Sequence, residues 1–325
     1  MKNSEDIPFS VVIPLYNKAP HIAETVQSVL NQTYSNFKLI IVNDASTDDS
    51  RDIVGTFDDD RIKIIERSTP GPGGYAARNR GIEESINDYI AFLDADDTWK
   101  ENFLKEMVAA IKKYPSSGFY SSGWVVKTDE ADQKLNSYAR KRAETGVHKI
   151  TLSEFLKSYI KGAGPVCSSA VVVKKSAIQK ANGFPENKCK FGGDIDTWFR
   201  IMLSGNSLTI NPVPLATYNR EAVNMVTKSH HFSITETCVK KTARNIDYDS
   251  LDISKRLVKQ FVNYFQYLQI RKKAMSATLL PNDLQYVYRT ENKLTYLVFR
   301  IYALLPKKMQ QLIVTGYNSI KENYK

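Results

Sequence analysis

The chain has 325 residues, 42% of them hydrophobic and 25% charged, so it can bury a large core and is not expected to be disordered. Its net charge of +10 would suit a nucleic-acid-binding protein if it were spread over the chain. Residues 221–325, however, hold 17 Lys or Arg and 8 Asp or Glu, against 28 and 27 in residues 1–220, so the excess belongs to the C-terminal part alone.

The N-terminal third alternates short apolar runs with amphipathic stretches. Strands are predicted at 9–14, 37–42, 61–65 and 89–93, and helices at 21–32, 48–57 and 76–85. Continuous Val and Ile runs separated by helices with little spare loop are typical of a parallel sheet covered on both faces. The sequence therefore predicts an α/β fold, Rossmann-like and doubly wound.

Beyond a predicted helix at 101–114 the alternation weakens. Segments 119–127, 169–174 and 208–218 suit added strands of a mixed sheet. From about residue 253 the chain is predicted to be helical, with Pro281 and Pro306 as interruptions. The sequence therefore predicts an α/β region followed by a helical C-terminal extension.

No targeting signal is expected at the N-terminus. Glu5, Asp6 and Pro8 precede only a brief apolar run, and no uncharged apolar run approaches the ~18 residues needed to span a bilayer. The three cysteines lack the C-x-x-C spacing of a zinc site. We predict a cytoplasmic protein.

Carboxylates gather after the fourth predicted strand, where Asp94, Ala95, Asp96 and Asp97 follow one another. Ligands of open α/β sheets bind at the carboxyl ends of the strands, and adjacent carboxylates repel each other unless a positive charge lies between them. Mg²⁺ or Mn²⁺ takes one or two carboxylates and keeps positions for substrate phosphates. The alternative is a helix cap, which Asp97 and Thr98 could supply, but a cap requires only one oxygen. We predict a divalent cation, Mn²⁺ or Mg²⁺.

A second carboxylate, Asp44, ends the second predicted strand, where it could accept hydrogen bonds from a base or ribose. Ser46 with Asp49 resembles a capping box for the helix that follows. The Gly71-Pro72-Gly73-Gly74 stretch lacks G-x-G-x-x-G spacing and follows the third strand, so it predicts a turn and not a dinucleotide site. Arg78, in the helix after this turn, could still face an anionic ligand.

Asp194 follows two glycines at the start of a further predicted helix. From the residues alone, a helix cap is favoured over a role on a substrate. Asp196 and Arg200 are spaced i, i+4 and are predicted to form a structural ion pair. His230 and His231 could reach a metal or a diphosphate, although surface or core histidines are the more common outcome.

These residues together resemble family 2 glycosyltransferases. The resemblance lies in four ordered segments, SVVIPLYN (10–17), SVLNQTYSNFKLIIVNDASTD (28–48), AARNRGI (76–82) and YIAFLDADD (89–97), and in GDIDTWFR (193–200), which is similar to the family's catalytic-base helix. It departs from the family at Gly193, where Glu is frequent, and at Asn43 and Ala45, where the family commonly has Asp and Gly. No Gln-x-x-Arg-Trp motif of processive synthases is present.

The resemblance implies a GT-A fold and an inverting transfer of a sugar, as in a hexosyltransferase, from a nucleotide diphosphate donor such as a UDP-sugar to a hydroxyl acceptor in polysaccharide or glycolipid biosynthesis. By position it implies metal binding through Asp96 of the Asp-x-Asp motif and Asp194 as the general base, which reverses the preference for a cap. The residues it implies in donor binding are Pro14, Tyr16, Asp44, Arg78, Asp94 and Ala95.

The implied organisation is a catalytic domain over residues 1–225, with a nucleotide-binding half (1–100) and an acceptor-binding half (101–225), and a basic, aromatic-rich helical region over 226–325. Two other functions stay open. A nucleotidyltransferase would need a glycine-rich loop after the first strand, which Leu15-Tyr16-Asn17-Lys18 does not supply. A non-catalytic nucleotide-sugar-binding protein would lack metal binding, and no nucleic-acid partner is expected.

The C-terminal tail has two interpretations. Residues 255–325 hold 13 Lys or Arg and 3 Asp or Glu, interleaved with Phe261, Tyr264, Phe265, Tyr267, Tyr296 and Phe299. Helices of this composition could lie peripherally on the anionic inner face of a membrane and bring the enzyme to a lipid-linked acceptor. Equally, the aromatic residues could pack on the catalytic domain and leave the charges solvated.

Overall fold

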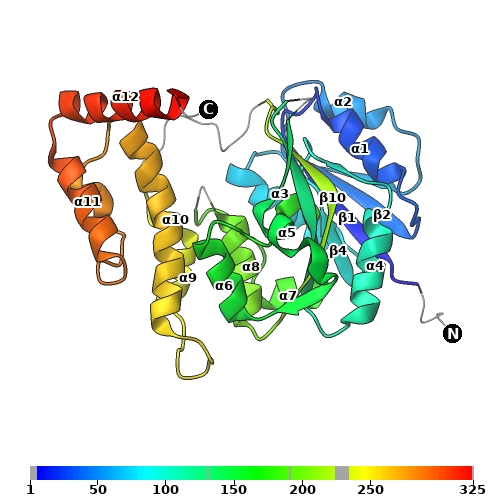
Figure 1. Ribbon diagram of the computed structural model, residues 1–325. Coiled ribbons are helices and arrows are strands. Elements are labelled where there is room, and N and C mark those ends of the chain that lie inside the picture. Colours follow the sequence, from blue (N-terminus) through cyan, green and yellow to red (C-terminus); the bar gives the residue numbers. More distant parts are fainter. Residues whose placement is uncertain (1–5, 130–131, 190–191, 224–233, 324–325) are drawn as a thin grey trace. The chain divides into compact units, whose positions relative to one another are not determined.

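The computed structural model describes residues 6–129, 132–189, 192–223 and 234–323 (Figure 1). The chain divides into two compact units, residues 1–229 and 230–325. Among the described residues, no helix is both long and apolar enough to cross a membrane.

The first unit is built on one mixed sheet, which has 10 strands in the described part of the chain. Its main path, in spatial order, is β3 (Ile62–Glu66), β2 (Phe37–Asn43), β1 (Phe9–Leu15), β4 (Tyr89–Phe92), β9 (Val171–Lys174), β6 (Phe119–Lys127), β10 (Leu208–Asn219) and β5 (Thr98–Trp99). Strands β7 (Gln133–Leu135) and β8 (His148–Ile150) pair with β6 and β10. The strands from β3 to β4 are parallel, whereas β9 is antiparallel to both of its neighbours.

Helices cover both faces of this sheet, as the continuous apolar strands predict. They are α1 (Ile22–Leu30), α2 (Ser50–Gly55), α3 (Tyr75–Glu84), α4 (Phe103–Lys113), α5 (Ser137–Arg142), α6 (Leu152–Ile160), α7 (Lys175–Lys180) and α8 (Gly193–Leu203), with short 3₁₀ turns η1 (Pro72–Gly74), η2 (Ala143–Thr145) and η3 (Ser168–Ala170). Apolar residues of α1, α2 and α4 form one core cluster with Val11 and Ile13 of β1. Because side chains alternate along a strand, Val12 faces the other side, where α3 packs.

Helix α8 is anchored on the same side as α3 by aromatic packing. Trp198 is fully buried and stacks on Phe119 of β6, with ring centroids 5.9 Å apart. It also meets Phe184 edge to face at 5.6 Å and lies 6.3 Å from Phe92 of β4. This packing fixes the N-terminus of α8, and therefore Asp194, beside the end of β4.

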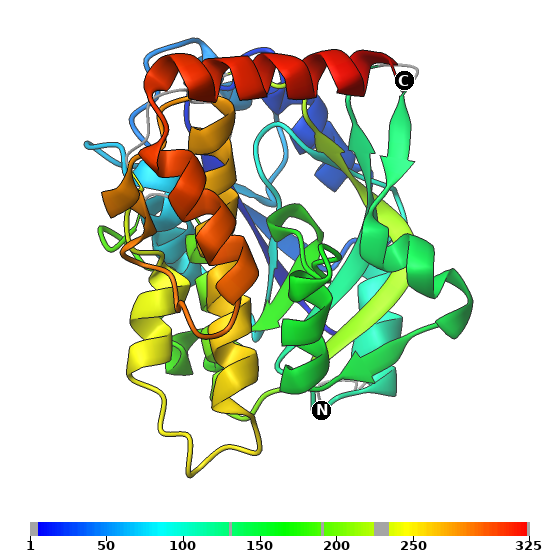
Figure 2. The ribbon, with the colours of Figure 1, turned by 60° about the vertical axis from the view of Figure 1, so that its left-hand side comes forward.

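The second unit is helical, as the sequence predicts beyond about residue 253. It contains α9 (Cys238–Arg244), α10 (Lys255–Met275), the 3₁₀ turn η5 (Pro281–Leu284), α11 (Lys293–Leu304) and α12 (Lys307–Asn323). In both ribbon views α12 runs across the ends of α10 and α11 (Figure 1, Figure 2). The second unit has its own core cluster, which includes Tyr267, Ile270, Leu279, Leu284 and Ala303.

The lack of a side chain at Gly81 allows α3 to approach strand β1 closely. A Cβ added at Gly81 would lie 2.3 Å from Cγ1 of Val12, a fully buried side chain of β1. Gly81→Ala must therefore push α3 from the strand, and we expect a loss of about 1–3 kcal/mol in the free energy of unfolding. Gly55→Ala, at the end of α2, meets only the tip of the Arg51 side chain at 3.0 Å and is the matched control. Urea denaturation should show a lower midpoint for Gly81→Ala alone, and equal midpoints for the two variants would contradict the close packing.

Candidate active site

The polar loops meet where the order of the parallel strands reverses. Strand β1 lies between β2 and β4, so the chain leads from β1 to its neighbour on one side and later enters the sheet again on the other side of β1. A crevice at such a switch point is the usual ligand site of an open α/β sheet. Residues 16–19 follow β1 and residues 94–97 follow β4, on the two sides of this point.

The loop after β1 is held by the loop after β2. Asn17, which has a positive φ of 50°, donates its backbone N–H to Ser46 Oγ at 3.1 Å. The backbone N–H of Lys18 donates to Ser50 Oγ at 2.8 Å, and that of Ala19 to Asp48 Oδ2 at 3.1 Å. These bonds fix where the Lys18 side chain starts.

The same contacts correct the predicted capping box. Helix α2 begins at Ser50, and its N-cap residue Asp49 makes no side-chain cap hydrogen bond. Asp48 instead accepts the backbone N–H of Ser50 at 3.1 Å, while Ser46 is engaged by Asn17. The prediction failed because Ser46 bonds across to a loop that is distant in sequence.

Asp44 is buried and already has partners. Its carboxylate accepts from the Arg67 guanidinium and from the backbone N–H of Gly71 at 3.0 Å. The backbone N–H of Asp44 donates to Leu15 O at 2.7 Å, which ties it to the end of β1. Sequence reasoning missed Arg67, although its position directly after β3 puts it on the same rim. A nucleoside at Asp44 would therefore meet an ion pair and not an isolated carboxylate.

Next to Asp44, Ala45 has a φ of 59°, in the left-handed region. A side chain in this region costs roughly 1–2 kcal/mol, which glycine avoids. The resemblance described above leads one to expect Gly here, and the backbone geometry gives a reason. The departure at Ala45 changes local strain and leaves the Asp44 carboxylate in place.

Asp94 and Arg78 form an ion pair at the end of β4. Arg78 is buried; its guanidinium contacts Asp94 Oδ1 and donates to Gly73 O at 3.0 Å. Its Nε has no hydrogen-bond partner among the described residues, although buried donors are normally paired. Arg78 thus lies beside Asp94 at the carboxyl end of β4, and one of its buried donors is unpaired among the described residues.

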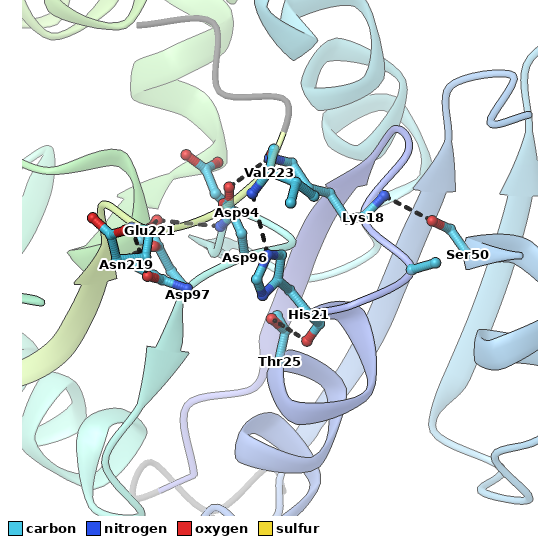
Figure 3. Close-up of polar contacts among 12 residues, drawn as sticks. Lys18, His21, Thr25, Ser50, Asp94, Asp96, Asp97, Asn219, Glu221 and Val223 are labelled. Atoms are coloured by element: carbon cyan, nitrogen blue, oxygen red, sulfur yellow. Dashed lines mark hydrogen bonds and ion pairs between the residues drawn. The ribbon is translucent and has the colours of Figure 1, made fainter. Parts of the chain in front are cut away.

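Asp96 is bound by an ammonium group. Lys18 Nζ lies 2.7 Å from Asp96 Oδ2 and donates to Val223 O at 2.6 Å (Figure 3). His21 Nε2 accepts the Val223 N–H at 3.3 Å. Burial raises the pKa of Asp96 above its usual value; Lys18 lowers it, and the negative charge of Asp94 raises it. Sequence reasoning passed over Lys18 and His21. Both follow the first strand closely, so the rule that ligands bind at the carboxyl ends of the strands could have identified them.

Asp97 is structural, but it is not the helix cap considered above. Helix α4 begins only at Phe103, because Thr98 and Trp99 form β5. The buried Asp97 carboxylate accepts from the Ser169 hydroxyl and from the Asn219 N–H at 2.8 Å. Burial raises its pKa well above the usual value, and Asp96 and Asp94 add to this effect. Asp97 therefore joins the loop after β4 to η3 and β10.

Asp194 lies in the first turn of α8 and is electrostatically coupled to the Arg78–Asp94 pair. Burial raises the pKa of Asp194; the positive charge of Arg78 lowers it, and the negative charge of Asp94 raises it. Ser168 Oγ donates to Asp194 Oδ2 at 3.4 Å. The sequence separates Asp194 from Asp94 by about a hundred residues, and the fold brings them to one place. The predicted Asp196–Arg200 ion pair is confirmed, with Nε and Oδ2 2.8 Å apart.

The glycine before Asp194 also has a steric reason. The Gly193 N–H donates to Tyr75 Oη at 2.9 Å, and a Cβ at Gly193 would lie 2.6 Å from the Tyr75 ring. The Tyr75 ring thus fills the space that a larger residue at 193 would need.

The remaining predicted donor-binding residues differ in exposure. Tyr16 is 44% exposed at the rim, and Pro14 is partly buried near the end of β1. The Ala95 side chain belongs to the apolar core cluster, so only its backbone could reach a ligand. His230 and His231 lie outside the described residues.

The donor set around Asp96 fits a divalent cation that is shared with a substrate. The described residues contain no group of three or more His, Cys, Asp or Glu that could hold a metal by itself. The Lys18 ammonium lies between the Asp96 carboxylate and the carbonyl oxygen of Val223, which are oxygen ligands of the kind that a divalent cation takes. Mg²⁺ and Mn²⁺ sites commonly combine one or two carboxylates with substrate phosphates, and Asp96 meets that requirement.

The chain is similar in sequence to glycosyltransferases. The profile of a family described as Glycosyl transferase family 2 matches residues 10–176. An uncharacterized glycosyltransferase of Rickettsia bellii is 30% identical over 226 residues, covering 67% of this chain and 30% of that protein. The Escherichia coli enzyme named UDP-Glc:alpha-D-GlcNAc-diphosphoundecaprenol beta-1,3-glucosyltransferase WfgD is 30% identical over 154 residues, covering 47% of this chain and 57% of that protein.

A solved structure resembles nearly the whole chain. The crystal structure of S. aureus TarS 1–349 in complex with UDP-GlcNAc superposes with a TM-score of 0.70 and 17% identity, covering 96% of this chain and 92% of that one. At 17% identity, the structural match supports the fold alone. The chain spans only 30% to 31% of the length of the first three curated relatives.

Proposed function

The chain belongs to glycosyl transferase family 2, and we propose that it transfers a sugar, with inversion, from a UDP-sugar to a hydroxyl acceptor. One observation carries the proposal. The candidate base Asp194 lies close enough to Asp94 and Arg78, which are proposed donor-binding residues, for their charges to shift its pKa. An acceptor hydroxyl and a donor diphosphate could therefore meet between two carboxylates with separate roles.

On the donor side, Pro14, Tyr16 and the Asp44–Arg67 pair would receive the nucleoside. Asp94, oriented by Arg78, would contact the ribose or diphosphate, together with the Ala95 backbone. A divalent cation, Mn²⁺ or Mg²⁺, bound through Asp96 would supply positive charge to the diphosphate. In this scheme residues 1–100 bind the nucleotide, 101–225 the acceptor, and 226–325 form an appended helical region.

On the acceptor side, Asp194 would accept the proton of the attacking hydroxyl. The hydroxyl oxygen forms its bond to the anomeric carbon from the face opposite the diphosphate, whose oxygen leaves with the electron pair. One displacement inverts the anomeric centre and needs no covalent enzyme intermediate. Ser168, which donates to Asp194, would hold the carboxylate in orientation.

The choice of donor and acceptor class is supported by the names of similar proteins. TarS was crystallised with UDP-GlcNAc, and the name of WfgD states a UDP-glucose donor and a diphosphoundecaprenol-linked acceptor. We extend these classes to this chain: a UDP-sugar, and a carbohydrate or lipid-linked acceptor in polysaccharide or glycolipid synthesis. The same proposal places the protein in the cytoplasm, in peripheral contact with the inner face of the membrane.

A panel of nucleotide sugars tests this function. UDP-sugars should raise the melting temperature in the presence of Mn²⁺ more than in excess chelator, because a ligand that binds only the folded state stabilises it. With an acceptor present, UDP should be released. A nucleotidyltransferase would instead release pyrophosphate from a nucleoside triphosphate and a sugar phosphate. Binding without release of UDP for any acceptor would favour a non-catalytic protein.

A further inference from the structure

Three aromatic residues of the tail, Tyr267, Tyr296 and Phe299, pack inside the second unit. Tyr267 is buried in the core of the second unit and stacks on Phe299 with ring centroids 5.7 Å apart. Tyr296 and Phe299 pack against the same core cluster. These three residues therefore hold the helical unit together, and an exposed apolar face must come from other side chains.

Helix α11 exposes a different apolar row. Leu294, Leu297, Val298, Ile301 and Leu304 are spaced i, i+3, i+4, i+7 and i+10, which places them on one side of the helix. Each is between 52% and 76% exposed. The opposite side of α11 supplies the buried contacts, so the helix is apolar on both sides.

Helix α12 continues the pattern. Its exposed apolar residues are Met309, Leu312, Ile313 and Tyr317. It is attached to the unit through the buried Gln310, which donates to Leu279 O and Leu305 O, each at 3.1 Å. Nine of the sixteen exposed large apolar side chains in the described part of the chain thus lie between residues 294 and 317. Such a concentration marks an interaction surface more often than chance exposure does.

The charges beside this surface have one sign. Lys293, Arg300, Lys307 and Lys308 are exposed, and residues 293–318 contain no Asp or Glu. None of the four forms a salt bridge with another described residue. A second copy of the chain would bring like charges together, whereas anionic lipid headgroups would complement them while aliphatic side chains enter the acyl boundary.

We propose that α11 and α12 form an interfacial surface that binds anionic lipid membranes. The nine apolar side chains would lie at the boundary of headgroups and acyl chains, with the four cations at headgroup level. The inference rests on the second unit alone and stands whatever sugar the first unit transfers. A membrane-bound chain would encounter a lipid-linked acceptor at the surface where that acceptor is confined.

Co-sedimentation of the full chain with vesicles tests the surface. Binding is expected to vesicles of phosphatidylcholine with phosphatidylglycerol and to weaken with added salt, with little binding to phosphatidylcholine alone. Replacing all four cations by Gln should weaken binding by about 100-fold or more, since each contributes about fivefold near an anionic surface. Leu297→Ser combined with Ile301→Ser should also weaken binding. Ile86→Ser combined with Val213→Ser, at exposed apolar residues of the first unit, should leave it unchanged.

Three outcomes would overturn the proposal. Equal partitioning of the wild type and the tail variants would show that lipid binding, if any, lies elsewhere. Concentration-dependent self-association that the Leu297 and Ile301 replacements abolish, without vesicle binding, would assign the surface to a second copy. If the wild type does not bind vesicles and the same replacements lower the melting temperature markedly, the rest of the chain covers the apolar row of α11.

Discussion

Asp194→Asn is expected to bind the donor normally and to transfer sugar about 10²–10⁴ times more slowly, the range typical for loss of a general base. The amide keeps the size of the side chain and cannot accept the acceptor's proton. The nucleotide contacts proposed for Asp44, Asp94 and Arg78 are untouched. Isothermal titration with UDP and a turnover assay with the donor identified by screening measure the two quantities separately.

The pKa of Asp194 adds a pH signature. Burial is the largest cause that raises this pKa above the usual 3.8, and the base works only when ionised. The kcat/KM of the wild type should therefore fall, as pH decreases, at a higher pH than an ordinary aspartate would give. This fall at low pH should be absent from the pH profile of the residual activity of Asp194→Asn.

The same shift has a consequence for stability. A carboxyl group whose folded pKa is raised favours its protonated form in the folded state, so ionisation destabilises the fold as pH rises through that pKa. Asp194→Asn removes the buried charge and should melt at the same or a higher temperature at neutral pH. Asp196→Asn is the contrast, because it breaks the buried pair with Arg200 and should lower the melting temperature. Near-normal transfer by Asp194→Asn would reassign Asp194 to the first turn of α8 as a structural residue.

Much of the fold could be predicted because its signal is local. The GT-A fold is confirmed, and the runs that became β1, β2 and β4 are so apolar that their ends fall within a residue or two of prediction. The strand at 119–127 matches β6. Strand β5, in contrast, has only two residues and exists because Thr98 and Trp99 pair with Thr217 and Ala216. No local pattern could reveal a partner more than a hundred residues away.

In the candidate site, too, some residues have a local sequence signal and others depend on distant partners. Asp44, Asp94, Asp96 and Asp194 could be selected because carboxylates follow strands or glycines in a familiar order. Their partners Lys18, Arg67 and Ser168 come from other elements, and only the fold shows that they neutralise or orient these carboxylates. The predicted caps failed at Ser46 and Asp97 for the same reason, since each side chain bonds to a distant segment.

Asp96→Ala is expected to lower turnover by about 10³-fold or more. Lewis-acid stabilisation of a leaving diphosphate contributes several kcal/mol, and each ~1.4 kcal/mol is a factor of ten. The chain should remain folded, because Asp96 lies in a loop and its partner Lys18 keeps a hydrogen bond to Val223 O. Titration of the variant with Mn²⁺ and UDP should show nucleotide binding that no longer depends on the cation. Undiminished turnover, or full wild-type activity in excess chelator, would contradict a metal role for Asp96.

Lys18→Met separates the two functions that Lys18 could serve beside Asp96. In the structure its ammonium lies where a divalent cation would meet the Asp96 carboxylate, so the two positive charges compete for the same oxygens. Methionine keeps most of the side-chain volume and removes the charge, and Mn²⁺ affinity measured in the absence of nucleotide should therefore rise several-fold. If Mn²⁺ affinity stays constant while UDP affinity falls, the Lys18 ammonium instead contacts the diphosphate. In Asp96→Ala the Lys18→Met replacement should have no further effect on Mn²⁺ binding, because the carboxylate through which the two cations compete is absent.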